Sequence, residues 1–245
     1  MTNIIRCRGL ILKTTPFKES SLIASVLTDI SGKVQLLAKG VRRPKSKICG
    51  AMEPFNLDEI IYYKREFKEM YNLSDAVVID DFEQIRNVPK KVNAALVLCE
   101  FYNKTVPPED VNAEAFSLLL NFLKTLEKSD TTDARSLAVG FLVKALSGSG
   151  VMPHLENCVC CRGPVAKNNG KIEFSISAGG IVCHRHHDDT VVFLKRPTFD
   201  ALKNIYSQEW HRIDSETSGE IEGFLVDYMY VHLNHTRLNT LKYLK

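Results

Sequence analysis

The sequence has little that would place it in a membrane or outside the cell. Its opening residues lack an apolar stretch behind a basic start, and no run approaches the roughly 18 apolar residues that a membrane span needs. Glycine and proline, at 13 and 9 of 245 residues, are too few for a collagen-like or linker-dominated chain. Seven cysteines, an odd number, argue against a disulfide framework in a chain without an export signal. We therefore expect a globular cytoplasmic protein with no membrane contact.

Motifs that mark common catalytic sites are also missing. The chain has no G-x-x-x-x-G-K-[ST] or G-x-G-x-x-G loop to cradle phosphates, and neither G-x-S-x-G nor H-E-x-x-H. The run Gly148-Ser149-Gly150 is typical of a helix terminator and not of a nucleophile elbow, because no strand precedes it. Without a base, a nucleophile and a metal in one constellation, the sequence indicates a binding protein and not an enzyme.

Positive charge is concentrated in the first fifty residues. They hold ten Lys or Arg against two acidic residues, although the whole chain carries a formal charge of only +3. The densest run has five basic residues in nine, from Lys39 to Lys47, and Gly40 and Pro44 make it a loop. Such an excess indicates an anionic partner, because phosphates release counterions when basic side chains neutralise them. The alternative is a solvated basic loop without a ligand.

Strand patterns fill the first 80 residues. Apolar and polar residues alternate over 4–13, two β-rich runs flank the Gly-containing connection 29–33, and further runs follow at 57–63 and 70–79. Five short strands in this length are typical of a small closed barrel, of which the OB-fold is the five-stranded example that binds oligonucleotides. A sandwich or an SH3-like barrel would give the same pattern.

Helical spacing replaces strand alternation after residue 80. Apolar residues recur at steps of three and four in five segments, which are 90–104, 112–127, 132–148, 197–206 and 218–235. We expect an α+β protein of several domains. They are a five-stranded barrel over 1–80, an α-helical domain over 81–152, a zinc-binding module over 153–195, and C-terminal helices over 196–245 that pack on the helical domain.

Cysteine and histidine gather in one short segment. Cys158 and Cys161 form a C-x2-C pair, and Cys183 and His186 form a C-x2-H pair after 21 intervening residues. Two such pairs on turns can place four ligands tetrahedrally around a metal, and soft thiolates with one imidazole favour zinc. Four protein ligands leave no position for a reactive water, so we expect a structural zinc with no hydrolytic role.

The same segment offers alternative ligands. Cys160 can replace a neighbouring cysteine, and His184 or His187 can replace His186. If the segment binds no metal, its cysteines are free thiols beside a run of surface histidines. A redox C-x-x-C fits less well, because it would open a helix within a βαβ unit.

Longer stretches carry a resemblance to a known family. They are residues 9–23, 27–33, 38–46 and 53–55 in the barrel segment, 153–161 and 174–183 around the cysteines, and 228–244, which looks like the family's closing helix. With these stretches the chain resembles, over its whole length, the RecO family of bacterial recombination mediators, and the loop that starts at Lys39-Gly40 is the most specific part. The resemblance implies an N-terminal OB-fold, a helical domain and a zinc-bearing insertion. Many relatives complete the metal site with a fourth cysteine, where this sequence has His186 or His187.

The resemblance also implies a function and partners. Family members bind single-stranded DNA, anneal complementary strands coated by the protein SSB and, with RecR, help to load RecA, without enzymatic turnover. The implied partners are therefore single-stranded DNA, SSB and RecR, with RecA indirectly, at the nucleoid in the bacterial cytoplasm. We expect basic side chains to hold the DNA phosphates, and they are Lys33, Lys39, Arg42, Arg43, Lys45 and Lys47.

Aromatic residues in the barrel segment are candidates for stacking on DNA bases. They are Phe17, Phe55, Tyr62 and Tyr63, although an aromatic side chain is more often part of a core. Two other functions compete with DNA binding. One is an adaptor with a structural zinc, whose helical domain binds protein tails and whose barrel does not touch DNA. The other is a zinc-dependent hydrolase, which a closed four-ligand site disfavours.

Overall fold

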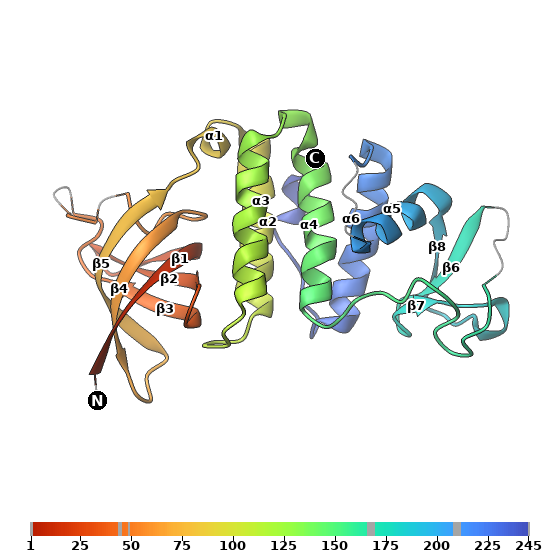
Figure 1. Ribbon diagram of the computed structural model, residues 1–245, viewed down its shortest axis with the longest axis horizontal. Helices are drawn as coiled ribbons and strands as arrows, with labels where there is room; N and C mark the ends of the chain where they lie inside the picture. Colours follow the sequence, from red (N-terminus) through yellow and green to blue (C-terminus); the bar gives the residue numbers. More distant parts are fainter. Residues whose placement is uncertain (1, 44–45, 49, 166–169, 208–211, 245) are drawn as a thin grey trace. The chain divides into compact units, whose positions relative to one another are not determined.

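A computed structural model describes residues 2–43, 46–48, 50–165, 170–207 and 212–244. The chain divides into two compact units, one formed by Met1–Ala134 with Tyr243–Lys245 and the other by Arg135–Lys242 (Figure 1). Each unit is described by itself. The four segments expected from the sequence remain a prediction about how the chain is organised.

The first unit begins with a closed five-stranded barrel. Its strands are β1 (Thr2–Phe17), β2 (Ser21–Thr28), β3 (Gly32–Ala38), β4 (Leu57–Arg65) and β5 (Met70–Asp80). They are hydrogen-bonded in the order β1-β2-β3-β5-β4, with β4 returning to β1 and with β3 and β5 parallel. A closed five-stranded barrel of this kind is OB-like, which confirms the predicted barrel.

Strand β1 closes the barrel because it pairs on both sides. Its first part pairs with β4 from Thr2 to Leu10, and its second part pairs with β2, with a register shift between Ile11 and Lys13. Such a bulge bends a strand and increases its twist, which lets one long strand serve two partners. Gly9 lies two residues before this shift, where an added Cβ would come within 2.4 Å of the Val26 side chain. Only glycine therefore fits there.

The barrel core consists of the side chains that alternate inward along all five strands. The members below 3% exposure include Ile11, Ala24, Val26, Val34, Leu36, Ala38, Ile60 and Tyr62. Residues between β3 and β4 cover one end of this core, because Ala51 and Met52 are also buried in it. The N–H of Met52 donates to the buried carboxylate of Asp58 at 2.8 Å, which fixes the covering loop to β4.

Three helices follow the barrel in the first unit. They are α1 (Glu83–Arg86), α2 (Pro89–Thr105) and α3 (Ala113–Lys128). Proline at the start of α2 suits a position whose N–H has no partner within a helix, and Asn112 caps α3 by accepting from the N–H of Ala115. Helix α2 packs against β1, and α3 packs against α2 through a buried apolar face. The helices predicted at 90–104 and 112–127 are confirmed.

The connection between α2 and α3 lies along β3. Pro108 forms a parallel bridge with Lys33, and the N–H of Glu109 donates to the carbonyl of Lys33 at 2.9 Å. The Glu109 carboxylate also pairs with the amine of Lys64 at 2.7 Å and accepts from the hydroxyl of Tyr71. This connection therefore covers the outer side of the barrel where β3 begins.

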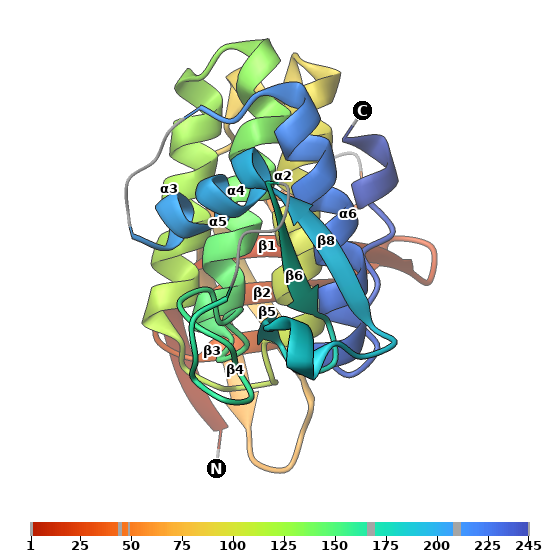
Figure 2. The same cartoon turned by 90° about the vertical axis from the view of Figure 1, so that its right-hand side faces the viewer.

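The second unit surrounds a small three-stranded sheet. A 3-10 turn (Thr131–Asp133) leads into α4 (Ala134–Gly148), and the sheet has the order β7-β6-β8, from β6 (Lys171–Ser175), β7 (Gly180–Ile181) and β8 (Val191–Lys195). Helices α5 (Arg196–Tyr206) and α6 (Ser215–His232) follow, and Figure 2 shows β6 and β8 side by side. The helices expected at 132–148 and 197–206 are confirmed. Strand β8 was not predicted.

Helix α6 ends earlier than the sequence suggested. The expected helix ran to His235, and the resemblance implied a helix to Leu244, but α6 stops at His232. Asn234 and His235 have positive φ values of 47° and 59°, and the N–H of His235 donates to the carbonyl of Tyr230 at 3.0 Å. This left-handed ending terminates the helix, and the 3-10 turn Leu241–Tyr243 follows before the described residues end at Leu244. Within the described ranges, no helix is both long and apolar enough to pass through a membrane.

Candidate metal centre and nucleic-acid interface

Two tight turns carry the cysteine and histidine pairs. The first turn closes when the N–H of Arg162 donates to the carbonyl of Cys158 at 2.8 Å, with Arg162 at a φ of 60°. The second is the 3-10 turn His184–His186, in which the N–H of His186 donates to the carbonyl of Cys183 at 2.8 Å. The N–H of Val159 donates to the carbonyl of Ile181 in β7 at 2.9 Å, which holds the two turns together.

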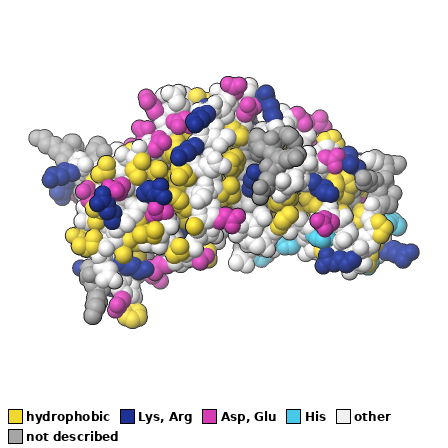
Figure 3. Space-filling model, viewed as in Figure 1, with side chains coloured by type: hydrophobic (Ala, Val, Ile, Leu, Met, Phe, Trp, Pro, Cys, Tyr) yellow, Lys and Arg dark blue, Asp and Glu magenta, His cyan; other side chains and the backbone are white. Residues whose placement is uncertain are grey.

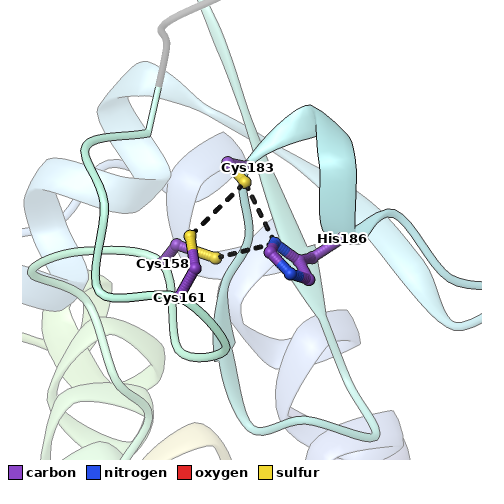
Figure 4. Close-up of side chains that lie close together, drawn as sticks. All are labelled: Cys158, Cys161, Cys183 and His186. Carbon is purple, nitrogen blue, oxygen red and sulfur yellow. Dashed lines mark hydrogen bonds between the residues drawn. The ribbon is translucent and has the colours of Figure 1, made fainter.

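The turns bring four potential ligand atoms to one place. The Sγ atoms of Cys158, Cys161 and Cys183 and a ring nitrogen of His186 all lie within 4.8 Å of one another (Figure 4). The Cys161 and Cys183 sulfurs are 3.8 Å apart, and the Cys158 sulfur is 3.7 Å from Nδ1 of His186. Zinc bonds of about 2.3 Å to sulfur and about 2.0 Å to nitrogen, arranged tetrahedrally, require separations of about 3.5–3.8 Å. Both separations match these values, and the Cys183 sulfur is 3.2 Å from Nδ1 of His186, so small side-chain shifts would place the four atoms around a metal of the size of zinc.

The Cys158 thiol is the most protected of the four. Its residue is fully buried, and burial raises the pKa of a thiol. Hydrogen bonds from the backbone N–H groups of Cys161, Cys183 and Cys160 outweigh this effect and lower the pKa to about 6. Backbone donors that converge on a sulfur stabilise the thiolate form, which is the form that binds metals.

The alternative ligands lie elsewhere. Cys160 is exposed and is not one of the four clustered residues. Nδ1 of His187 is 3.1 Å from the Glu173 carboxylate, so its ring is engaged on another side of the module, and His184 is exposed. The geometry thus favours the C-x2-C and C-x2-H set over the replacements that the sequence left open.

A polar network steadies the chain after the second turn. The carboxylate of Asp188 accepts from the hydroxyls of Ser175 and Thr190 and from the Thr190 N–H at 2.7 Å. These donors lower the pKa of Asp188 to about 2, with the Ser175 hydroxyl as the main cause. The network joins the end of β6 to the start of β8 and so holds the second turn at the sheet.

The basic loop projects from the barrel next to the β1–β2 connection. The N–H of Arg42 donates to the carbonyl of Ser20 at 3.0 Å, and Gly40 has a φ of 69° that allows the turn. Lys39, Arg42, Arg43 and Lys47 are exposed, and no ion pair in the part of the chain that the structure describes engages them. Lys45 lies outside the described residues. Figure 3 shows Lys and Arg side chains at the barrel end that carries this loop.

Lys33 has a different environment from the other basic candidates. It is 9% exposed, and its amine donates to the carbonyl of Asn103 in α2 at 2.7 Å. Burial lowers its pKa. The α2–α3 connection covers this side of β3, so we leave Lys33 out of the proposed contact surface.

The four aromatic candidates fall into two pairs. Phe55 is 3% exposed beneath the Arg86 guanidinium, whose carbon lies 4.3 Å from the ring centre. Tyr62 is fully buried in the barrel and stacks on Tyr71 at 5.5 Å. These two belong to the core. Phe17 is half-buried and Tyr63 is exposed, so both rings remain accessible to a ligand.

Sequence reasoning missed a wider surface on the barrel. We call the side chains that point outward from β1, β2, β3 and the start of β5 the outer barrel face. Its exposed or half-exposed members are Lys13, Thr15, Phe17, Ser21, Ile23, Gln35, Leu37, Lys39, Met70, Asn72 and Ser74. Register pairs such as Ile23 with Leu37 and Leu37 with Asn72 make it continuous. None of these residues is acidic, and the face adjoins the basic loop. Its members are far apart in sequence, so only the strand pairing reveals it.

Comparisons with known proteins agree along the whole chain. The family model described as "Recombination protein O N terminal" matches residues 1–82, and the one described as "Recombination protein O C terminal" matches residues 86–242. The chain is similar to the DNA repair protein RecO of Alkaliphilus metalliredigens, with 24% identity over 99% of both chains. It is also similar to that of Caldicellulosiruptor saccharolyticus, with 32% identity over 73% of this chain and 70% of the relative. The boundary between the two matches falls where the barrel ends and the helices begin.

Proposed function

Because the chain belongs to the RecO family of DNA repair proteins, we propose that it is a recombination mediator that binds single-stranded DNA. In this role it anneals complementary strands and, with RecR, helps to load RecA onto DNA coated with SSB. It acts by binding and not by turnover, and it does so at the nucleoid in the bacterial cytoplasm.

The observation that carries the proposal is the basic loop beside the outer barrel face. Its described cations, Lys39, Arg42, Arg43 and Lys47, are exposed and have no carboxylate partner among the described residues. We include Lys45 in the loop on its sequence position. Unpaired cations next to a face without acidic residues attract a phosphate backbone, and they read no base sequence. A protein that anneals arbitrary complementary strands needs such sequence-tolerant binding.

The metal centre has a structural part in this proposal. Cys158, Cys161, Cys183 and His186 would hold one zinc ion, which would cross-link the turn at 158–163 to the turn at 184–186. A zinc with four protein ligands supplies folding free energy and has no open position for chemistry. The zinc thus belongs to the architecture of the second unit.

Fluorescence anisotropy with labelled single-stranded DNA tests the proposal. We expect the double variant Arg42→Ala/Arg43→Ala to bind all sequences roughly tenfold more weakly at about 0.1 M salt, with a smaller salt dependence, because two phosphate contacts are lost. The matched control is Lys124→Ala/Lys128→Ala, which removes two exposed positive charges from α3. This control should bind DNA as the wild type does.

Other outcomes would point elsewhere. Failure of the wild-type protein to bind single-stranded DNA would contradict the proposed function. Tight binding to SSB without any binding to DNA would favour an adaptor that recognises protein tails. Equal losses in the test and control variants would mean that only net charge matters, and the loop would not be the DNA contact.

A further inference from the structure

The turn between β4 and β5 holds an aromatic residue with no role in the fold. Phe67 lies in the four-residue connection between Arg65 and Met70, and its relative exposure is 101%. A phenylalanine that contacts water on all sides contributes nothing to the core, because apolar side chains stabilise a fold only when they are buried. Folding alone therefore does not account for this side chain.

The backbone at Phe67 is also unfavourable for its residue type. Its φ is 59°, in the left-handed region that glycine or asparagine adopts more easily. Bulky residues that persist in this region, with no contact to compensate, are more frequent where a site has a function. Phe55 and Phe82 also have a positive φ, but both are buried, so the combination of this backbone with full exposure sets Phe67 apart as a candidate ligand contact.

Strand pairing places this turn at the far end of the outer barrel face from the basic loop. Met70 of β5 lies opposite Gln35 of β3, and the two strands are parallel. Lys39 lies four residues beyond Gln35 in one direction, and Phe67 lies three residues before Met70 in the other. The two ends are therefore separated by a distance on the order of 20 Å along the face. That length suits the several-nucleotide sites of OB-fold proteins.

The charges of the turn specify the kind of contact. Arg65 and Lys68 are balanced by Glu66 and Glu69, so the turn carries no net charge that would attract phosphates. An uncharged flat ring suits a base, since every base offers a face for stacking without regard to sequence. A strand held by its phosphates at the basic loop would cross the outer barrel face, pass beside the Lys64–Glu109 ion pair and reach the ring with its bases.

We infer that Phe67 stacks on a base of single-stranded DNA and marks the end of the DNA path opposite the basic loop. This inference rests on the proposed function and adds a second contact, of different chemistry, to the same surface. Phosphate binding and base stacking would then occupy separate ends of one face.

The test compares oligo(dT) of about ten nucleotides with an abasic oligonucleotide of the same length. We use Phe67→Asn, because asparagine tolerates a positive φ and keeps the turn folded. We expect the variant to bind oligo(dT) about tenfold more weakly than the wild type, with an unchanged salt slope. Its binding to the abasic strand should equal that of the wild type, because the phosphate contacts remain.

A control variant and a second probe sharpen this test. Phe193→Ala removes another exposed phenylalanine, 56% exposed in β8 of the second unit, and should leave both affinities unchanged. Phe67→Trp keeps a stacking ring, so it should retain affinity for oligo(dT). Its added fluorescence, beyond that of the single tryptophan in the chain, should be quenched by oligo(dT) and not by the abasic strand.

The outcomes separate this inference from the proposed function. Wild-type protein that binds neither oligonucleotide would defeat both. Wild-type protein that binds DNA, with Phe67→Asn showing unchanged affinity for oligo(dT), would defeat the stacking site alone. An equal loss for oligo(dT) and the abasic strand would also overturn stacking, because the loss would not depend on bases.

Discussion

The barrel and the cysteine-histidine module are held together by different means. All five barrel strands pair in a closed ring, and their inward side chains form one continuous apolar core. The module, from Pro153 to Lys195, has three short strands, and β7 contributes only two residues. One of its buried apolar residues, Phe174, packs on the rings of Phe224 and Tyr228 in α6.

The two regions therefore gain their stability from different interactions, and this decides which of their side chains remain available for binding. Apolar burial stabilises the barrel without a ligand, so its exposed side chains are free to bind one. In the module, the side chains that a metal would bind are the ones that join its two turns. A small module with little core depends on such a cross-link.

The largest expected effect is on the module alone. Removing the metal with a chelator, or substituting Cys183→Ala, should abolish amide hydrogen-exchange protection in the two turns and β7, because zinc binding to such sites contributes on the order of 10 kcal/mol. Protection of the barrel amides should not change. The exposed neighbour Cys160→Ala serves as the control. Retained protection after complete metal removal would mean that the module folds on its own.

The reverse experiment targets the barrel. Ile60 is fully buried in the core, and Ile60→Ala should lower the free energy of unfolding of the barrel by about 3 kcal/mol through lost burial and a cavity. Denaturation followed at barrel amides measures this loss, and the zinc content should stay the same. Ile4→Ala, at a position 67% exposed, should cost less than about 0.5 kcal/mol. Loss of bound zinc in the Ile60→Ala variant would mean that the stability of the module depends on the barrel core.

A smaller effect depends on pH and concerns the loop that covers the barrel. Burial raises the pKa of Asp58 to about 6, against the opposing hydrogen bond from Met52, and Glu53 raises it further while Arg86 lowers it. The folded state then holds a proton that the unfolded state releases near pH 4. Barrel stability should therefore fall by about 2 kcal/mol as pH rises from about 4 to about 6.

The variant Asp58→Asn checks this assignment. It should lose the fall in stability over that pH window, because asparagine does not titrate, and equilibrium unfolding at several pH values measures it. Glu19→Gln is the control, because Glu19 is an exposed carboxylate of the same unit and is not among the groups that shift the pKa of Asp58. An unchanged pH profile in Asp58→Asn would assign the proton to another group.

The smallest expected effect is a gain in stability. Phe67→Gly should raise the free energy of unfolding by about 0.5–1 kcal/mol, because it relieves the positive φ at the turn and loses no buried contact. Thermal unfolding of the barrel measures the change. Tyr63→Gly, in the extended part of β4, should destabilise instead. A destabilised Phe67→Gly would show that the ring contributes to the fold.

Local patterns in the sequence were sufficient for much of this structure. Alternation identified the five barrel strands, and the two spaced pairs identified the residues that the turns bring within 4.8 Å, because each pair lies within one turn. Features that depend on distant segments were not predictable. Lys33 looked like an exposed cation, but the α2–α3 connection, some seventy residues later, covers it.

Phe67 and the end of α6 are two further features that the sequence did not predict. A single phenylalanine in a short turn forms no pattern, and its importance follows only from its exposure and its φ. The apolar spacing near His235 continued past the real end of the helix, because a left-handed ending at Asn234 can be adopted by residues that also fit a helix. The outer barrel face is equally invisible in sequence, since its members meet only through strand register.

The double pairing of β1 has a consequence during protein synthesis. The first half of β1 cannot pair until the ribosome has made β4, because Thr2 pairs with Arg65. At about 5–20 residues per second, a ribosome needs roughly 3–13 seconds to make the intervening chain. Throughout that interval a strand edge that includes Ile4 and Ile5 has no partner, and unpaired apolar edges are prone to aggregation. The nascent barrel therefore has an open apolar edge until its fourth strand emerges.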